Sequence, residues 1–158
     1  MYRVLFLSQR NSARSIMAEA LVNAPGNHRL HACSAGSHPA GKVHPLAIEK
    51  LSSVGYPTDG LRSKGWEEFT GSDAPILDIV ITVCDNAADE VCPIWPGAPI
   101  SAHWGCEDPA AATDAEQRQA FDRVFRLLQQ RVRRLLALPL TTLDRAALQR
   151  ELMDIGQG

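Results

Sequence analysis

The stretch "VLFLSQRNSARSIMAEAL", residues 4–21, joins a short apolar run to a helical pattern through a polar segment. The run "YRVLFL", residues 2–7, is rich in β-branched and aromatic side chains and predicts a buried first strand. Residues 15–22 repeat apolar side chains with helical periodicity, and Pro25 and Gly26 end that pattern. A tight polar loop that opens a helix after the first strand is typical of oxyanion sites, because its N–H groups and the positive end of the helix attract an anion.

The rest of the chain alternates strand and helix patterns. We predict strands in "RLHACSAG" (29–36), "ILDIVITVCD" (76–85) and "PISAHWG" (99–105), a helix in "HPLAIEKLSSVG" (44–55) and a helical turn in "WEEF" (66–69). Such alternation favours parallel strands joined by crossover helices. The predicted fold class is therefore α/β, a single-domain three-layer sandwich with a central parallel sheet of about four strands.

The clearest helical pattern follows Thr113, which has capping-box spacing to Glu116. Its apolar stripe contains Phe121, Val124, Phe125, Leu128, Val132, Leu135 and Leu136. Pro139 ends the pattern, and a weaker amphipathic segment follows with Leu148, Leu152 and Ile155 on one side. We divide the chain into a main domain, 1–138, and a C-terminal tail, 139–158, packed on the same domain.

Composition excludes several classes of protein. The 158 residues are 45% hydrophobic and 22% charged, with a net charge of −2, so bulk charge does not favour nucleic acid or an anionic membrane as a partner. No apolar run approaches the length of a membrane span, and Arg3 interrupts the first run, which is too short for a signal peptide. We expect a cytoplasmic protein whose four cysteines remain reduced except during a reaction.

The loop after the first strand supplies the candidate binding residues. Arg14 offers a planar fork to two oxygens of a tetrahedral anion, and Asn11 tolerates left-handed backbone geometry. Ser12 and Ser15 can cap the helix and hydrogen-bond the side chain at position 8. The predicted oxyanion-binding residues are Gln9, Arg10, Asn11, Ser12, Ala13, Arg14 and Ser15. From these residue types alone, a capped helix start with a surface arginine is an equal alternative.

A resemblance favours the functional interpretation. Ser8, five residues, Arg14 and Ser15 resemble the C-x5-R-S phosphate loop of the low-molecular-weight tyrosine phosphatase fold. Residues 80–109, "VITVCDNAADEVCPIWPGAPISAHWGCEDP", are similar to its thioredoxin-coupled arsenate-reductase branch, and "SAG" at 34–36 fits the same family. The chain departs from the pattern at the position of the nucleophilic cysteine, which is Ser8.

The resemblance implies a catalytic set of Ser8 (nucleophile position), Arg14, Cys84, Cys92 and Asp108. In the family mechanism the first cysteine carries arsenate, the second attacks its sulfur and releases arsenite, and the third forms a disulfide for thioredoxin to reduce. By position, Cys84 is the resolving thiol and Cys92 the relay thiol. Glutathione with glutaredoxin is the alternative reductant if Cys92 is idle. Asp108 matches the general acid, with Glu107 as its rival.

Serine changes what such a loop can do. A thiol titrates near pKa 8.5, and a helix N-terminus with a neighbouring cation lowers this to roughly 3.5–7.5. A serine hydroxyl stays protonated without a base, and it cannot pair into a disulfide. Ser8 is therefore expected to bind oxyanions without reducing them. It represents either a deliberate Cys→Ser change in an arsenate reductase or a natural non-catalytic relative that binds phosphate or phosphoproteins. A disabled tyrosine phosphatase is the remaining alternative.

We expect no tightly bound cofactor and no metal site, although His103 and Cys106 have i, i+3 spacing. Some relatives bind a monovalent cation under the loop at positions that match Asn11, Glu19 and Ser34. Lys64 stands where a carboxylate would help that cation, which argues against potassium in this chain. Cys33 and Cys106 are interpreted as structural, and Trp104 as a core residue.

Overall fold

The computed structural model describes residues 1–24, 29–84, 95 and 97–158. Its sheet has four parallel strands, β1 (Tyr2–Ser8), β2 (Leu30–Gly36), β3 (Ile79–Cys84) and β4 (Ile100–Cys106), in the order β2-β1-β3-β4. The helices are α1 (Arg14–Val22), α2 (Pro45–Ser53), α3 (Gln117–Leu136) and α4 (Arg145–Gln157), with short 3-10 turns η1 (Trp66–Phe69) and η3 (Pro109–Ala111). The predicted α/β fold with a four-stranded parallel sheet is confirmed.

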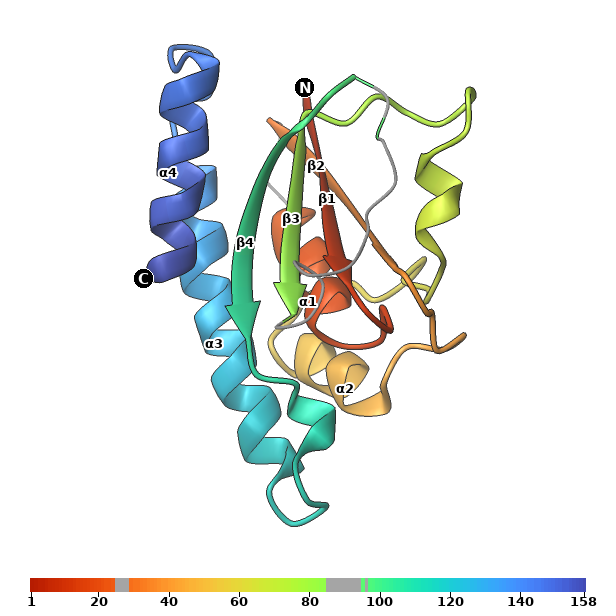
Figure 1. Cartoon of the computed structure of the whole chain (residues 1–158). Coiled ribbons are helices and arrows are strands. Elements are labelled where there is room, and N and C mark those ends of the chain that lie inside the picture. The colour runs from red at the N-terminus through yellow and green to blue at the C-terminus, as the bar shows by residue number, and fades with distance from the viewer. Residues whose placement is uncertain (25–28, 85–94, 96) are drawn as a thin grey trace.

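The order of the strands in the sheet indicates where a ligand-binding site is expected. The chain leaves β1 toward β2 on one side and later returns to β3 on the other, so the carboxyl end of β1 lies at a switch in strand order. Crevices that bind ligands form at such switch points in open parallel sheets. Figure 1 shows β1, β3 and β4 pointing toward the same end of the molecule, where α1 begins.

The two faces of the sheet are covered unequally. One face packs against the helices in a large apolar cluster that includes Phe6, Trp104 and Phe121. The opposite face carries a smaller cluster around Leu5, Leu7 and Val80, covered by Phe69 of η1 and by the segment that contains Leu77. The three layers are therefore a thick helical layer, the sheet, and a thin layer without a long helix among the described residues.

The C-terminal helix, α4, packs beside β4 and also contacts α3 (Figure 1). Leu148, Leu152 and Ile155 are buried, as their spacing predicts, and the indole N–H of Trp104 donates to the carbonyl oxygen of Leu152 at 2.9 Å. Trp104 is fully buried, which confirms it as a core residue. The domain boundary at residue 138 stays a prediction.

Two predicted caps are wrong. The residue before α1 is Ala13, with no side-chain cap, and Ser15 lies inside the helix. The predicted contact of Ser15 with position 8 is confirmed, since its hydroxyl lies 2.7 Å from that of Ser8. The pattern after Thr113 becomes helical only at Gln117. Glu116 there makes no side-chain cap, and its N–H donates to the carbonyl oxygen of Thr113 in a turn.

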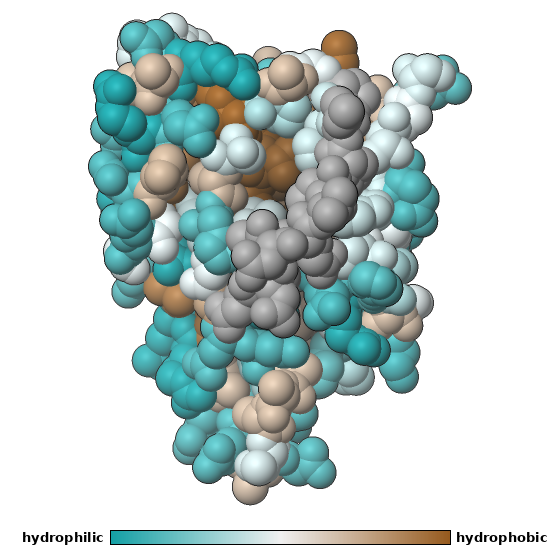
Figure 2. Space-filling model, in the orientation of Figure 1, coloured by the Kyte–Doolittle hydropathy of each residue, from teal (hydrophilic) through white to brown (hydrophobic). Residues whose placement is uncertain are grey.

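On the face seen in Figure 2 hydrophilic residues predominate, and hydrophobic colour gathers in a recess over the strands. No helix in the described ranges combines the length and apolar character that crossing a bilayer requires.

Candidate functional site: an oxyanion loop between β1 and α1

The loop between β1 and α1 is held in a fixed, curved conformation. Asn11 adopts a positive φ of 48°, a conformation that asparagine tolerates better than most residues. Its side-chain oxygen accepts the N–H of Lys64 at 2.9 Å, which ties the loop to the segment before η1. The carbonyl oxygens of Gln9 and Arg10 accept N–H groups of His38 and Ala40. The loop is therefore anchored from two neighbouring segments.

Hydrogen-bonding groups converge on the side chain at position 8. The Ser8 hydroxyl accepts the N–H of Asn11 at 3.1 Å and lies 2.7 Å from the hydroxyl of Ser15. The Asn11 amide in turn donates to the Ser15 hydroxyl at 2.8 Å. Ser8 is only 4% exposed and lies at the N-terminal end of α1. These donors and the helix end would stabilise negative charge on an atom at this position.

Gly36 explains why "SAG" ends the second strand. A Cβ atom at Gly36 would lie 2.6 Å from the carbonyl oxygen of Gln9 and 3.0 Å from the nitrogen of Asn11. Both neighbours are backbone atoms of the loop, so they cannot yield by changing rotamer. The loop therefore packs directly on the end of β2, and only glycine leaves room for it.

Arg14 faces the loop from the first turn of α1. One of its Nη atoms donates to the carbonyl oxygen of Cys106 at 3.1 Å, and the other lies 3.8 Å from a carboxylate oxygen of Asp108. The other oxygen of Asp108 accepts the N–H of Ala110 at 3.0 Å. These interactions hold the Arg14 guanidinium and the Asp108 carboxylate at the border of the same cavity.

The structure separates the two candidate acids. Glu107 makes two hydrogen bonds to Arg123 of α3, at 2.9 and 3.2 Å, and lies on the surface. This pairing lowers the pKa of Glu107. Asp108 instead borders the cavity. Geometry therefore favours Asp108 as the proton donor.

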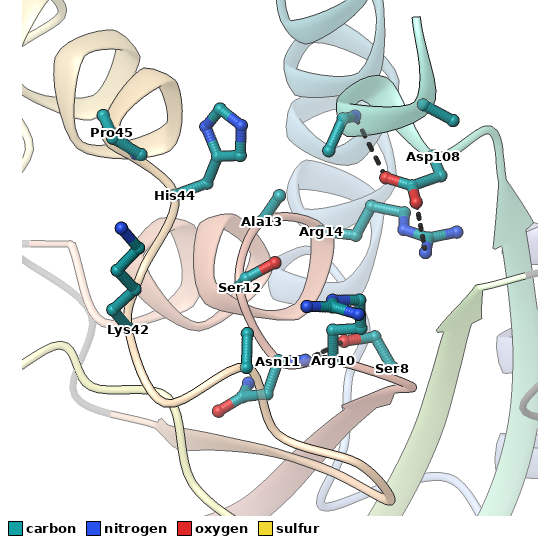
Figure 3. Close-up of a pocket in the computed structure, with 13 residues that line it drawn as sticks. Ser8, Arg10, Asn11, Ser12, Ala13, Arg14, Lys42, His44, Pro45 and Asp108 are labelled. Atoms are coloured by element: carbon teal, nitrogen blue, oxygen red, sulfur yellow. Dashed lines mark hydrogen bonds and ion pairs between the residues drawn. The ribbon is translucent and has the colours of Figure 1, made fainter.

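A cavity of about 520 Å³ opens over the loop (Figure 3). It is lined by Ser8, Arg10, Asn11, Ser12, Ala13, Arg14, Ala40, Lys42, His44, Pro45, Asp108, Ala110 and Ala111. Most of the predicted loop residues border it. Gln9 and Ser15 do not, because Gln9 is exposed and Ser15 lies buried behind Ser8.

Lys42 and His44 border the cavity from the segment before α2, and sequence analysis did not identify them as site residues. The Nδ1 atom of His44 accepts the N–H of Leu46 at 3.1 Å, which caps α2, and its ring packs against Phe121. Burial lowers the pKa of His44; Asp108 opposes this effect and Lys42 adds to it. The sequence feature closest to these two residues is the helix start predicted at Pro45. That feature does not place the segment at the loop, because its position there depends on packing between residues distant in sequence.

Charged side chains are buried beneath the loop. Glu19 of α1 accepts the Ser34 hydroxyl at 2.7 Å and lies 3.8 Å from the Lys64 ammonium, which also donates to the carbonyl oxygen of Arg62. Burial raises the pKa of Glu19 and lowers that of Lys64, while each partner opposes the shift of the other. The Lys64 ammonium thus supplies a positive charge beside the Glu19 carboxylate beneath the loop.

The thiols are distributed over several positions. Cys84 is the last residue of β3 and pairs in register with Cys106, while Cys92 lies outside the described residues. Cys106 is buried and its thiol donates to the carbonyl oxygen of Val83 at 3.1 Å. Burial, aided by Glu19, raises the pKa of Cys33 to about 12, so this thiol is unreactive at neutral pH.

His103 lies near Thr82, and the described residues contain no group of three side chains suited to a metal ion.

Comparisons with known proteins agree with this geometry. The chain is 32% identical over 137 residues to a glutaredoxin arsenate reductase of Synechocystis sp., covering 87% of this chain and 98% of the relative. A solved arsenate reductase in its phosphate-binding state superposes with a TM-score of 0.67 and 31% identity, covering 87% of this chain and 98% of that one. A thioredoxin-dependent arsenate reductase of Corynebacterium glutamicum gives a TM-score of 0.56 and 30% identity, covering 84% of this chain and 62% of that one.

The family described as low molecular weight phosphotyrosine protein phosphatase matches residues 3–152. The match begins in β1 and ends within α4, so it includes the loop, the residues that line the cavity and all of α3. With its phosphate-type loop, parallel sheet and related sequences, the chain belongs to the low molecular weight phosphotyrosine protein phosphatase family.

Proposed function

We propose that this chain is an arsenate reductase of the thiol-relay type whose nucleophile position is occupied by Ser8. The observation that carries the proposal is the convergence on Ser8 of the Asn11 N–H, the Ser15 hydroxyl and the start of α1. Such an arrangement serves a thiolate, which needs stabilisation as an anion, far better than it serves a neutral hydroxyl. The similarity to arsenate reductases supports arsenate as the substrate.

The chain as it stands binds the oxyanion without reducing it. Among the described residues, the Ser8 hydroxyl makes hydrogen bonds with the Ser15 hydroxyl and the Asn11 N–H, neither of which is a base that could remove its proton. Reduction of arsenate also requires two electrons, which thiols supply by forming a disulfide. An alkoxide cannot do this.

In the Ser8→Cys variant the full cycle balances. The new thiolate displaces water from protonated arsenate and forms a sulfur–arsenic bond, with Asp108 giving the proton to the leaving oxygen. Cys84 then attacks that sulfur. A disulfide forms, and the sulfur–arsenic electron pair stays on arsenic, which leaves as arsenite. Cys92 attacks Cys84, regenerates the first thiol and leaves a Cys84–Cys92 disulfide.

An external dithiol must reduce that disulfide. We assign this role to thioredoxin, with glutaredoxin and glutathione as the alternative, since both kinds of reductant occur in the names of similar proteins. The relay needs free thiols between turnovers, which suits the cytoplasm.

The test is arsenate-dependent NADPH oxidation with thioredoxin and thioredoxin reductase, run on this chain and on Ser8→Cys. We expect activity only in Ser8→Cys, and its loss when Cys84→Ser or Cys92→Ser is added. Cys33→Ser in the same background is the matched control and is expected to retain activity, because the raised pKa keeps this thiol protonated. No activity in Ser8→Cys, with glutaredoxin and glutathione also tried, would contradict the proposal.

A phosphatase is the second candidate because the family includes them. Among the residues that the structure describes, the cavity lining contains no phenylalanine, tyrosine or tryptophan to hold a phenyl ring, which disfavours phosphotyrosine. Hydrolysis of p-nitrophenyl phosphate by Ser8→Cys, at a catalytic efficiency above that for arsenate, would favour the phosphatase instead.

A further inference from the structure

The cavity is larger than a tetrahedral oxyanion needs. Its volume of about 520 Å³ lies in the range of pockets that hold whole small molecules, whereas arsenate or phosphate is a single atom with four oxygens. The loop, Arg14 and Asp108 account for one part of the lining. Lys42, His44 and Pro45 line another part, which an anion seated over Ser8 would leave empty.

Two exposed cations, Arg10 and Lys42, border this cavity. No hydrogen bond or ion pair joins their side chains to any residue that the structure describes. Some other cations, such as Lys50, Arg62 and Arg123, pair with carboxylates. In Figure 3, Lys42 and Asp108 stand on opposite sides of the loop, with Arg10 between them in the view. Unneutralised cations facing a pocket favour a ligand with a matching negative group.

The apolar part of the lining limits the shape of that ligand. It consists of alanines and one proline, namely Ala13, Ala40, Pro45, Ala110 and Ala111. These side chains offer small contact areas and no aromatic face. They fit a compact aliphatic skeleton better than an aromatic ring.

We propose that the pocket binds small aliphatic phosphomonoesters that carry a second anionic group, with the phosphoryl group over Ser8 and the second group at Lys42. This inference rests on the proposed oxyanion site and adds a class of ligand to it. The ester stays intact in the chain as it stands, because the described residues that hydrogen-bond to the Ser8 hydroxyl include no base to activate it. His44 contributes little charge at neutral pH because burial lowers its pKa, so the attraction for the second group comes from the lysine.

The test is calorimetric titration of the unmodified chain with four probes at 150 mM salt: inorganic phosphate, phenyl phosphate, glycerol 3-phosphate and 3-phosphoglycerate. The last two share a three-carbon skeleton and differ in a hydroxymethyl or a carboxylate group at one end. We expect 3-phosphoglycerate to bind at least about tenfold more tightly than glycerol 3-phosphate, because its carboxylate gains one charge-assisted contact. In Lys42→Gln that preference is expected to fall to about twofold or less, while phosphate binding is kept.

Arg133→Gln is the matched control. It removes the same unit of charge from an exposed position on α3 outside the cavity, and the preference for 3-phosphoglycerate is expected to survive it. Equal affinity for the two esters would overturn the inference, as would an equal loss in both variants or tighter binding of phenyl phosphate. If inorganic phosphate itself does not bind, the oxyanion site fails as well, so the two failures are distinguishable.

Discussion

At the scale of single residues, the proposed function predicts that position 8 decides whether the loop performs chemistry. The hydroxyl of Ser8 occupies the point where the Asn11 N–H, the Ser15 hydroxyl and the start of α1 converge. The same surroundings would act on a thiol by favouring its anion. Position 8 can therefore be tested separately from the binding site around it.

The thiol introduced by Ser8→Cys is expected to titrate below the ordinary value of about 8.5, because these donors stabilise the thiolate. The measurement is the pH dependence of thiolate absorbance near 240 nm, taken as the difference from the unmodified chain. Adding Asn11→Ala removes the side-chain donor to Ser15 and is expected to raise the pKa again. A pKa at or above about 8.5 would mean that the loop does not stabilise an anion there.

Asp108 and Glu107 provide a matched pair of neighbouring carboxylates. In the Ser8→Cys background, Asp108→Asn is expected to lower kcat by about 10²–10⁴, the usual contribution of a positioned proton donor. Glu107→Gln is expected to stay within about twofold, because Glu107 is held by Arg123 on the surface. Steady-state arsenate reduction measures both, and a larger loss in Glu107→Gln would reverse the assignment.

At the scale of elements, β2 and α1 support the loop through close contacts. Gly36→Ala is expected to lower the free energy of unfolding by about 1–3 kcal/mol, since the added methyl group would meet the loop backbone at Gln9 and Asn11. Gly71→Ala is the control, because a Cβ there meets no atom within 4 Å. Urea unfolding measures the free energy of unfolding of both variants. A loss in Gly36→Ala as small as that in Gly71→Ala would show that β2 does not pack tightly against the loop.

The buried Glu19 predicts a pH dependence of stability that α1, β2 and the Lys64 segment share. Burial raises its pKa in the folded state above 4.5, so folding is favoured while this group is protonated. That contribution is present below pH 4.5 and is lost as the pH rises through the raised value. The unmodified chain, measured relative to Glu19→Gln by urea unfolding, is therefore expected to be more stable at pH 4 than at pH 7. A relative stability that increases with pH would show that the Lys64 ammonium outweighs burial.

At the scale of the whole molecule, local patterns predicted the fold well. The four strands, the Pro45 helix start and the buried face of α4 follow from residues close in sequence, as does the left-handed Asn11. The caps proposed for Ser15 and Thr113 were wrong because Ser15 lies inside α1 beside Ser8, and the segment after Thr113 forms a turn before the helix begins at Gln117.

The rest of the cavity depends on contacts between distant segments. Lys42 and His44 line the cavity because the segment before α2 packs next to the loop. Glu107 hydrogen-bonds to Arg123 of α3, whereas Asp108 borders the cavity. No pattern within a short window of sequence contains such information. The predicted roles of Cys84 and Cys92 stay predictions that the variant assays address.

The central claim is that the loop between β1 and α1 holds a tetrahedral oxyanion, and calorimetric titration of the unmodified chain with arsenate tests it most directly. The account predicts one site per chain, competition by phosphate, loss of binding in Arg14→Gln and no arsenite formed during the titration. Absence of arsenate binding, or binding that Arg14→Gln leaves unchanged, would contradict it.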